Sequence, residues 1–516
     1  MNSVAVPRKL IIFAIVLPIA ALVGYQLATP DSFRSIGIVG MVLVVLSIPI
    51  LLRWHHPLLI FSWNTSISLF FLPGSLSLWM IMALASATIA LFERAMNREK
   101  SFLYVPSTAW PLILFAGVIL VTAKLRGGIG IRSLGGEAYG GKGYITLLLA
   151  IMGYFAFTSQ QIPAHRVNWY VSLFLLSGVT SVVSNLAYVA GPAFWWLFYL
   201  FPVDVAMSQV MADFVIEQQI ISRLSGLAFS AMAAFTFLLM RYGIRGIFDL
   251  SRPWRLLTFV LIAASSLFGG FRSIIVLMAS LFLVQFYLEG MFRTRLFFIL
   301  LLTGVVLGAA LIPVANRLPL AVQRSVCFLP LDLNPVAKRD AHESVEWRVE
   351  MWRVVATEIP KYLLLGKGYV INPADMYLAQ ESARRGLAQS GFEGAIVTGD
   401  YHSGPLSILI PFGIFGVIVV VWFWIASVRV LYLQFRYGEP RFRNVNTFFL
   451  AYFIAHVLQF LFVVGFIKSD LPTFVGILGL SISINGGVRK PGSLQLANAQ
   501  VDESLAVVGQ VSAHSP

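Results

Sequence analysis

Charged residues are scarce in this sequence. Only 12% of its 516 residues are charged, about half of the roughly 25% that soluble domains carry. So few charges could not solvate the surfaces of soluble domains of this total length, and the composition excludes a soluble enzyme. Because 58% of the residues are hydrophobic and 14% are aromatic, it also excludes a disordered or fibrous chain.

Cysteine is nearly absent as well. The single residue Cys327 excludes an intrachain disulfide and a cysteine metal cluster. A complete GxxxxGK[ST] phosphate loop is missing, which argues against an ATP-driven pump, and neither HExxH nor a DxD pair occurs. We therefore expect neither a metal ion nor a cofactor.

Long apolar runs are what the sequence has instead, and its mean hydropathy is +0.82. A helix needs about 20 apolar residues to cross the core of a bilayer, and about 14 runs of this kind (range about 11–14) recur along the chain. They are centred near residues 19, 44, 66, 84, 114, 152, 178, 232, 263, 282, 305, 417, 457 and 478. The run near residue 66 is weak because it contains Asn64. These runs predict an all-α polytopic membrane protein.

The distribution of polar residues predicts four parts. Residues 1–314 form an N-terminal transmembrane bundle, and residues 315–403 form one large extracytoplasmic loop that contains helices. A connection of that length is usually functional or disordered, and its tryptophans and tyrosines favour a folded one. Residues 404–486 form the C-terminal transmembrane helices, and residues 487–516 form a disordered cytoplasmic tail.

The net charge of +14 is explained by topology. If the N-terminus is cytoplasmic and the spans alternate, every predicted cytoplasmic connection carries Lys or Arg, as the positive-inside rule requires. This places the N-terminus and the C-terminus in the cytoplasm. The basic residues then indicate membrane orientation, and we expect no nucleic-acid partner.

The same alternation places four residues on the extracytoplasmic side: Arg223, Arg272, Arg348 and His402. Each also has an ordinary interpretation, since the arginines could be interfacial or surface residues and a lone histidine could cap a helix. As functional residues, arginines suit phosphate, and a histidine titrates near neutral pH. Arg348 and Trp352 are four residues apart and share a helix face, and Pro360 is expected to end that helix.

Four short motifs carry a resemblance to a known family. They are Phe271-Arg272-Ser273, Arg348 with Trp352, the turn Gly366-Lys367-Gly368-Tyr369, and His402-Ser403 followed by Gly413 and Gly416. Over roughly residues 220–430 the chain resembles the O-antigen polymerase and O-antigen ligase superfamily of bacterial envelopes. Two departures are the Arg-Ser order at 272–273, where Ser-Arg is usual, and His-Ser at 402–403, where polymerases more often have His-Asn.

The resemblance implies a metal-independent membrane glycosyltransferase of the bacterial inner membrane. Its donor would be a glycan on undecaprenyl diphosphate, presented among membrane lipid at the periplasmic face. The resemblance assigns His402, Arg272 and Arg348 to catalysis. It implies substrate contacts for Arg223, Arg353, Trp352 and Ser403.

Several functions stay open at this point. A polymerase of exopolysaccharide or O-antigen is favoured, and an O-antigen ligase that uses a lipid A–core acceptor is the alternative. A flippase or transporter of lipid-linked sugars is a second alternative, although the polar residues gather in one loop rather than at mid-membrane depth. A membrane scaffold is a third. The resemblance also implies a chain-length regulator or a flippase of the same pathway as partner.

Overall fold

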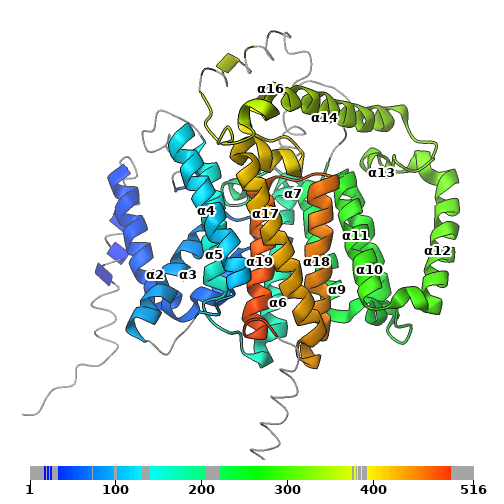
Figure 1. The fold of residues 1–516 in the computed structure, drawn as a ribbon. Helices are drawn as coiled ribbons and strands as arrows, with labels where there is room; N and C mark the ends of the chain where they lie inside the picture. Colours follow the sequence, from blue (N-terminus) through cyan, green and yellow to red (C-terminus); the bar gives the residue numbers. More distant parts are fainter. Residues whose placement is uncertain are drawn as a thin grey trace, which may run out of the picture. The chain divides into compact units, whose positions relative to one another are not determined.

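A computed structural model describes most of the chain (Figure 1). The described residues are 33–72, 74–97, 102–128, 140–203, 221, 223–372 and 392–489, together with a few single residues in 17–25 and 374–385. Most of the predicted run near residue 19, and the predicted tail from residue 490 onward, lie outside them.

The chain divides into two compact units, Met1–Leu58 and Leu59–Pro516. The first unit contains most of α2 (Phe33–Ser62), a helix that includes Pro49 and Pro57. The second unit contains all the other elements named below and all the site residues. The predicted division into a bundle, a loop, a second bundle and a tail stays a prediction.

Apolar helices dominate the second unit. Among the described residues, eight helices are long and apolar enough to cross a membrane, and three shorter apolar helices accompany them. The prediction of an all-α membrane protein is confirmed, and the number of spans stays a prediction. In chain order the helices of this bundle are α3 (Leu78–Met96), α4 (Pro106–Arg126), α5 (Gly141–Phe157), α6 (Val167–Leu176), α7 (Val182–Ala190), α9 (Ser225–Ile247), α10 (Pro253–Ser266), α11 (Arg272–Leu288), α12 (Arg295–Leu311), α17 (Gly404–Tyr437), α18 (Arg443–Phe462) and α19 (Ile467–Asn485).

Short 3₁₀ turns join several of these helices. They are η2 (Ala164–Arg166), η3 (Ser177–Ser181), η4 (Pro192–Tyr199), η5 (Leu267–Gly269), η6 (Met291–Arg293), η7 (Ile312–Arg317) and η8 (Pro440–Phe442). Helix α12 differs from its neighbours because none of its residues is buried, and it stands apart from α10 and α11 (Figure 1). A helix that is apolar on all sides and unburied in the protein is typical of one that faces lipid.

The expected span near residue 66 is not a continuous helix. Helix α2 ends at Ser62, and the chain continues into a small antiparallel hairpin of β1 (Ser68–Leu69) and β2 (Leu76–Ser77). The buried Trp63 donates from Nε1 to Pro472 O at 2.9 Å, and Asn64 donates from Nδ2 to Phe174 O at 2.8 Å. The prediction was wrong because the side chains of Trp63 and Asn64 bond to other helices at the point where the α-helical ladder ends.

Helix α17 is broken near its start. Gly413 has φ +64° and ψ −164°, outside the helical region, and the carbonyls of Ile410 and Pro411 accept hydrogen bonds from outside the helix. The amide N of Lys367 donates to Ile410 O at 2.7 Å, and that of Gly368 donates to Pro411 O at 3.0 Å. An unpaired carbonyl inside an apolar bundle costs several kcal/mol. The Gly-x-Gly turn that follows α14 therefore supplies donors that the broken helix needs.

The polar segment between α12 and α17 contains three helices within its described ranges. They are α13 (Leu320–Ser325), α14 (Pro335–Tyr362) and α16 (Glu393–Thr398). In Figure 1 α14 lies across one end of the bundle, at a steep angle to α17 and α18. The expected end of α14 at Pro360 is two residues early. A proline in the last turn removes only one helical hydrogen bond, and the helix runs on to Tyr362.

One face of α14 anchors it to the bundle. Met351 and Val355 are fully buried and cluster with Phe392, Tyr401 and Ile410 of the following segments. The side chain of Asn334 caps the start of α14 by accepting from Val336 N at 2.9 Å. These contacts hold a polar helix in one orientation on an apolar bundle.

The turn at Gly366 yields a stability prediction. Gly366 has φ +69°, and a Cβ there would stand 2.1 Å from Pro411 O. We expect Gly366→Ala to destabilise the protein by at least about 2 kcal/mol, through backbone strain and loss of the docked turn. Thermal unfolding in detergent measures this effect. Gly394→Ala in α16, where nothing lies within 4 Å of the added Cβ, is the matched control, and equal melting temperatures would contradict the role of the turn.

Candidate functional site

Four arginines from four parts of the chain meet at the end of the bundle that α14 covers. Arg223 precedes α9, Arg272 is the first residue of α11, Arg324 lies in α13, and Arg348 lies in α14. The charges of Arg272 and Arg324 repel that of Arg348, and Arg223 also feels both of them. Burial and this repulsion lower the pKa of the Arg348 guanidinium.

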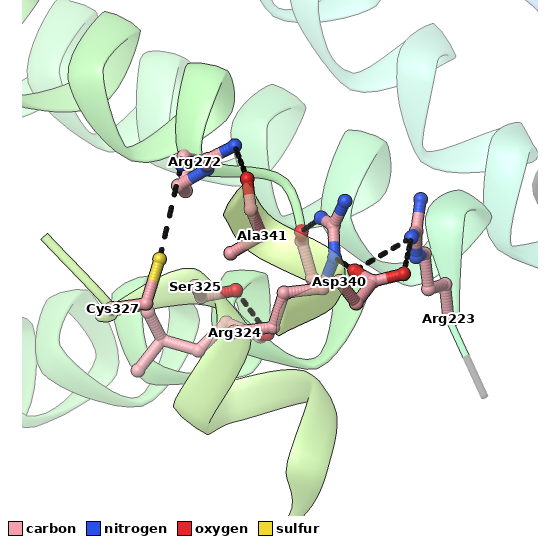
Figure 2. A network of polar contacts seen from close by, with 9 residues as sticks. Arg223, Arg272, Arg324, Ser325, Cys327, Asp340 and Ala341 are labelled. Carbon is pink, nitrogen blue, oxygen red and sulfur yellow. Dashed lines mark hydrogen bonds and ion pairs between the residues drawn. The ribbon is translucent and has the colours of Figure 1, made fainter. Parts of the chain in front are cut away.

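Asp340 contributes a carboxylate to this cluster (Figure 2). Arg223 donates from Nη2 to both carboxylate oxygens of Asp340 at 3.2 Å. Arg324 donates from Nε to the same carboxylate and from Nη1 to the carbonyl of Gly270. The four arginines and Asp340 together carry a formal charge of +3.

Arg272 and Arg348 have no carboxylate within ion-pair distance among the described residues. Arg272 donates from Nη2 to Ala341 O at 3.0 Å, and its Nη1 lies 3.9 Å from the sulfur of Cys327 (Figure 2). Both arginines are half-buried. A buried cation without a counter-charge is costly, so this arrangement is typical of a site that binds an anion.

His402 lies beside Arg348 in a constrained position. It is one of two described non-glycine residues with positive φ, at +48°, a conformation that is uncommon outside functional sites and turns. Its ring lies between Trp347, at 5.3 Å, and Phe466, at 4.8 Å. Burial first, and then the charge of Arg348, lower the pKa of His402 to about 4. The imidazole is therefore neutral at pH 7.

The residues before His402 are tied to their surroundings by hydrogen bonds. Trp352 donates from Nε1 to Tyr401 O at 2.7 Å, and Lys468 forms an ion pair with Asp400 at 3.0 Å. The side chain of Thr398 donates to Asp400 at 3.1 Å. These contacts from α14 and α19 fix the segment that presents the imidazole.

The predicted site residues fall into two groups. The structure brings Arg223, Arg272, Arg348 and His402 to one end of the bundle. Trp352 donates from its indole N–H to Tyr401 O. Ser403 is the N-cap residue of α17, and its carbonyl accepts from Ser407 N at 2.9 Å. Arg353 is exposed on α14. Substrate contacts for these three residues stay predictions.

Sequence reasoning missed Arg324 and the partnership of Asp340. Arg324 belongs to no recognised motif, and its side chain is only 5% exposed. A signal was present, because a single arginine in the apolar stretch 318–331 is unusual unless it is paired. For metal binding, no group of three His, Cys, Asp or Glu side chains gathers in the part of the chain that the structure describes.

These features define a class: a multi-pass membrane protein with a cluster of four arginines beside a neutral histidine, in which two arginines have no carboxylate partner among the described residues. Residues 257–421 match the family model described as O-Antigen ligase. This match confirms the resemblance to the O-antigen polymerase and ligase superfamily. Arg272, Arg348 and His402 all lie inside the matched segment. No curated protein sequence matches the chain.

The lowered pKa of His402 predicts a pH effect on stability. In the unfolded chain this pKa is about 6.5 and in the folded protein about 4, so acid protonates the unfolded state first. Stability is therefore complete above about pH 6.5 and falls as the pH drops toward 4. Between pH 7 and pH 5, we expect the wild type to lose about 1 kcal/mol more than His402→Gln, allowing for solvent screening. Thermal unfolding at both pH values measures this, and equal losses would contradict it.

Proposed function

We propose that the protein transfers an oligosaccharide from undecaprenyl diphosphate to an acceptor hydroxyl at the periplasmic face of the bacterial inner membrane. The family match supports a glycosyltransferase activity of the ligase or polymerase type. The observation that carries the proposal is the proximity of the neutral His402 to two arginines, Arg272 and Arg348, that have no carboxylate partner in the part of the chain that the structure describes. The N-terminus and the C-terminus are then cytoplasmic, as the basic connections favour.

Arg272 and Arg348 bind the diphosphate in this proposal. When the bond between the anomeric carbon and the phosphate oxygen breaks, the electron pair stays on that oxygen, and negative charge grows there. Fixed cations in a site that partly excludes water stabilise this charge more than water would. They are already in position, whereas water molecules must reorient as the charge develops. Two guanidinium groups can do this without a metal ion.

His402 acts on the acceptor. The acceptor oxygen attacks the anomeric carbon, and its proton passes to the neutral imidazole. A histidine with a pKa of about 4 is a weak base. A bound diphosphate would offset the charge of Arg348, which is one cause of that low value, and would raise the basicity of His402. Donor binding would thus favour activation of the acceptor.

Within this proposal we favour a polymerase of exopolysaccharide or O-antigen, whose acceptor is a second lipid-linked repeat unit. No residue of the chain specifies a lipid A–core acceptor, which the alternative, an O-antigen ligase, would use. His-Ser at 402–403 is the feature that points toward a ligase. A chain-length regulator or a flippase of the same pathway is the proposed partner.

The site assignment predicts the effect of three substitutions. We expect Arg272→Ala, Arg348→Ala and His402→Ala each to lower long-chain polysaccharide by about 100-fold or more, since each removes a group that acts in the transition state. Gel analysis of polysaccharide, normalised to membrane-inserted protein, measures this. Arg339→Ala, an exposed arginine on α14, is the matched control. Full activity in all three variants would refute the site.

Deletion of the gene separates polymerase from ligase. A lost polymerase leaves single repeat units on the final acceptor, because transfer continues without elongation. A lost ligase leaves long chains on the lipid carrier. Mass spectrometry of the lipid-linked and acceptor-linked glycans distinguishes the two, and unprocessed units held in the cytoplasmic leaflet would point to a flippase instead.

A further inference from the structure

Arg324 connects three segments of the site (Figure 2). It lies in α13, and its guanidinium donates both to Asp340 of α14 and to the carbonyl of Gly270 in the turn between α10 and α11. Only 5% of the Arg324 side chain is exposed, against 36% of that of Asp340, so the guanidinium is the shielded partner. Removing Asp340 would leave this buried positive charge without its carboxylate, which is disruptive.

The turn that Arg324 contacts leads directly to Arg272. Gly270 adopts φ +67°, and Arg272 begins α11 two residues later. A second bond supports the same turn, because Ser325 donates from Oγ to Leu267 O at 2.9 Å. Two consecutive residues of α13 therefore fix the turn from which the Arg272 side chain projects.

One turn of α14 accepts hydrogen bonds from both Arg324 and Arg272. The carboxylate of Asp340 accepts from Arg324, and the carbonyl of the next residue, Ala341, accepts from Arg272 at 3.0 Å. A displacement of Asp340 would therefore also displace a hydrogen-bond acceptor of Arg272. The same carboxylate also accepts from Arg223, so its charge is shared by Arg223 and Arg324.

We propose that Arg324 and Asp340 are positioning residues, which brace the guanidinium of Arg272 for the diphosphate without touching it. This inference rests on the proposed function. The brace joins the α10–α11 turn, α13 and α14 through one buried guanidinium. Asp340 pairs with Arg223 and Arg324, whereas Arg272 and Arg348 have no carboxylate partner among the described residues and can bind the ligand.

A lysine at position 324 distinguishes this role from a simple ion pair. Arg324→Lys keeps the positive charge and can still pair with Asp340. It lacks the planar fork that bonds Asp340 and Gly270 together. An ion pair that only stabilises the fold would tolerate this change, whereas a positioning brace would not.

Cys327 provides a reporter in the native sequence. It is the only cysteine of the chain, it is partly exposed, and its sulfur lies 3.9 Å from Nη1 of Arg272. A nearby cation speeds the reaction of a thiol with an anionic reagent such as methanethiosulfonate ethylsulfonate. Inorganic pyrophosphate, as a probe of the diphosphate site, should slow that reaction in the purified wild-type protein.

We expect Arg324→Lys and Asp340→Asn each to reduce, by about fivefold or more, the factor by which pyrophosphate slows the reaction of Cys327. We also expect each to lower the turnover of glycan transfer about tenfold or more. The double variant should lose no more than either single one, because the two residues act as a unit. Asp340→Asn keeps an acceptor oxygen and the side-chain volume. The brace can therefore still be tested with this variant if the Arg324→Lys protein does not insert into the membrane. Arg339→Lys and Glu343→Gln, exposed on α14, are the matched controls.

The outcomes separate the brace from the proposed function. No pyrophosphate protection in the wild type would overturn the diphosphate site itself. Protection in the wild type, with equal protection and turnover in both variants, would overturn the brace alone. A fall only in the amount of folded protein, with protection and turnover per folded molecule unchanged, would assign Arg324 and Asp340 to a stabilising ion pair and would also overturn the brace.

Discussion

The break in α17 is the constraint on which the site depends. A helix that unwinds at Gly413 exposes carbonyls in an apolar bundle, and those carbonyls must find donors. The amides of Lys367 and Gly368 supply them, and Arg126 secures the same turn by donating from Nε to Gly366 O at 2.8 Å. Since that turn follows α14 directly, the requirement of one broken helix determines where the polar helix with Arg348 lies on the bundle.

The positive charge of the arginine cluster opposes folding, and the same charge favours the binding of an anion. Arg272 and Arg348 are partly removed from water and have no carboxylate partner among the described residues, which is destabilising, and the lowered pKa of Arg348 reflects this unfavourable environment. An anionic ligand would relieve it. Where a carboxylate is present, at Asp340, it pairs with Arg223 and Arg324, and the net charge of the site persists.

The sequence predicted the helical membrane fold and predicted that Arg223, Arg272, Arg348 and His402 lie on one side of the membrane. Both predictions need only the alternation of spans along the chain, which hydropathy and basic residues indicate. The sequence did not predict Arg324, whose role depends on contacts with Asp340 and Gly270 that follow from packing rather than from spacing. It also treated the residues around Asn64 as a span. Mean hydropathy over a window does not record that Trp63 and Asn64 bond to other helices, and the same limit leaves the number of spans open.

Helix α14 connects the two halves of the proposed reaction. Near one end it holds Arg272 through Ala341, and farther along it holds Tyr401, the neighbour of His402, through Trp352. At 1.5 Å per residue these two contacts lie about 16 Å apart along the axis, and one inserted residue would turn them by about 100° relative to each other. An insertion or deletion between Ala341 and Trp352 would therefore misalign leaving-group binding with acceptor activation. The constant length of this rigid part of α14 keeps the two contacts aligned.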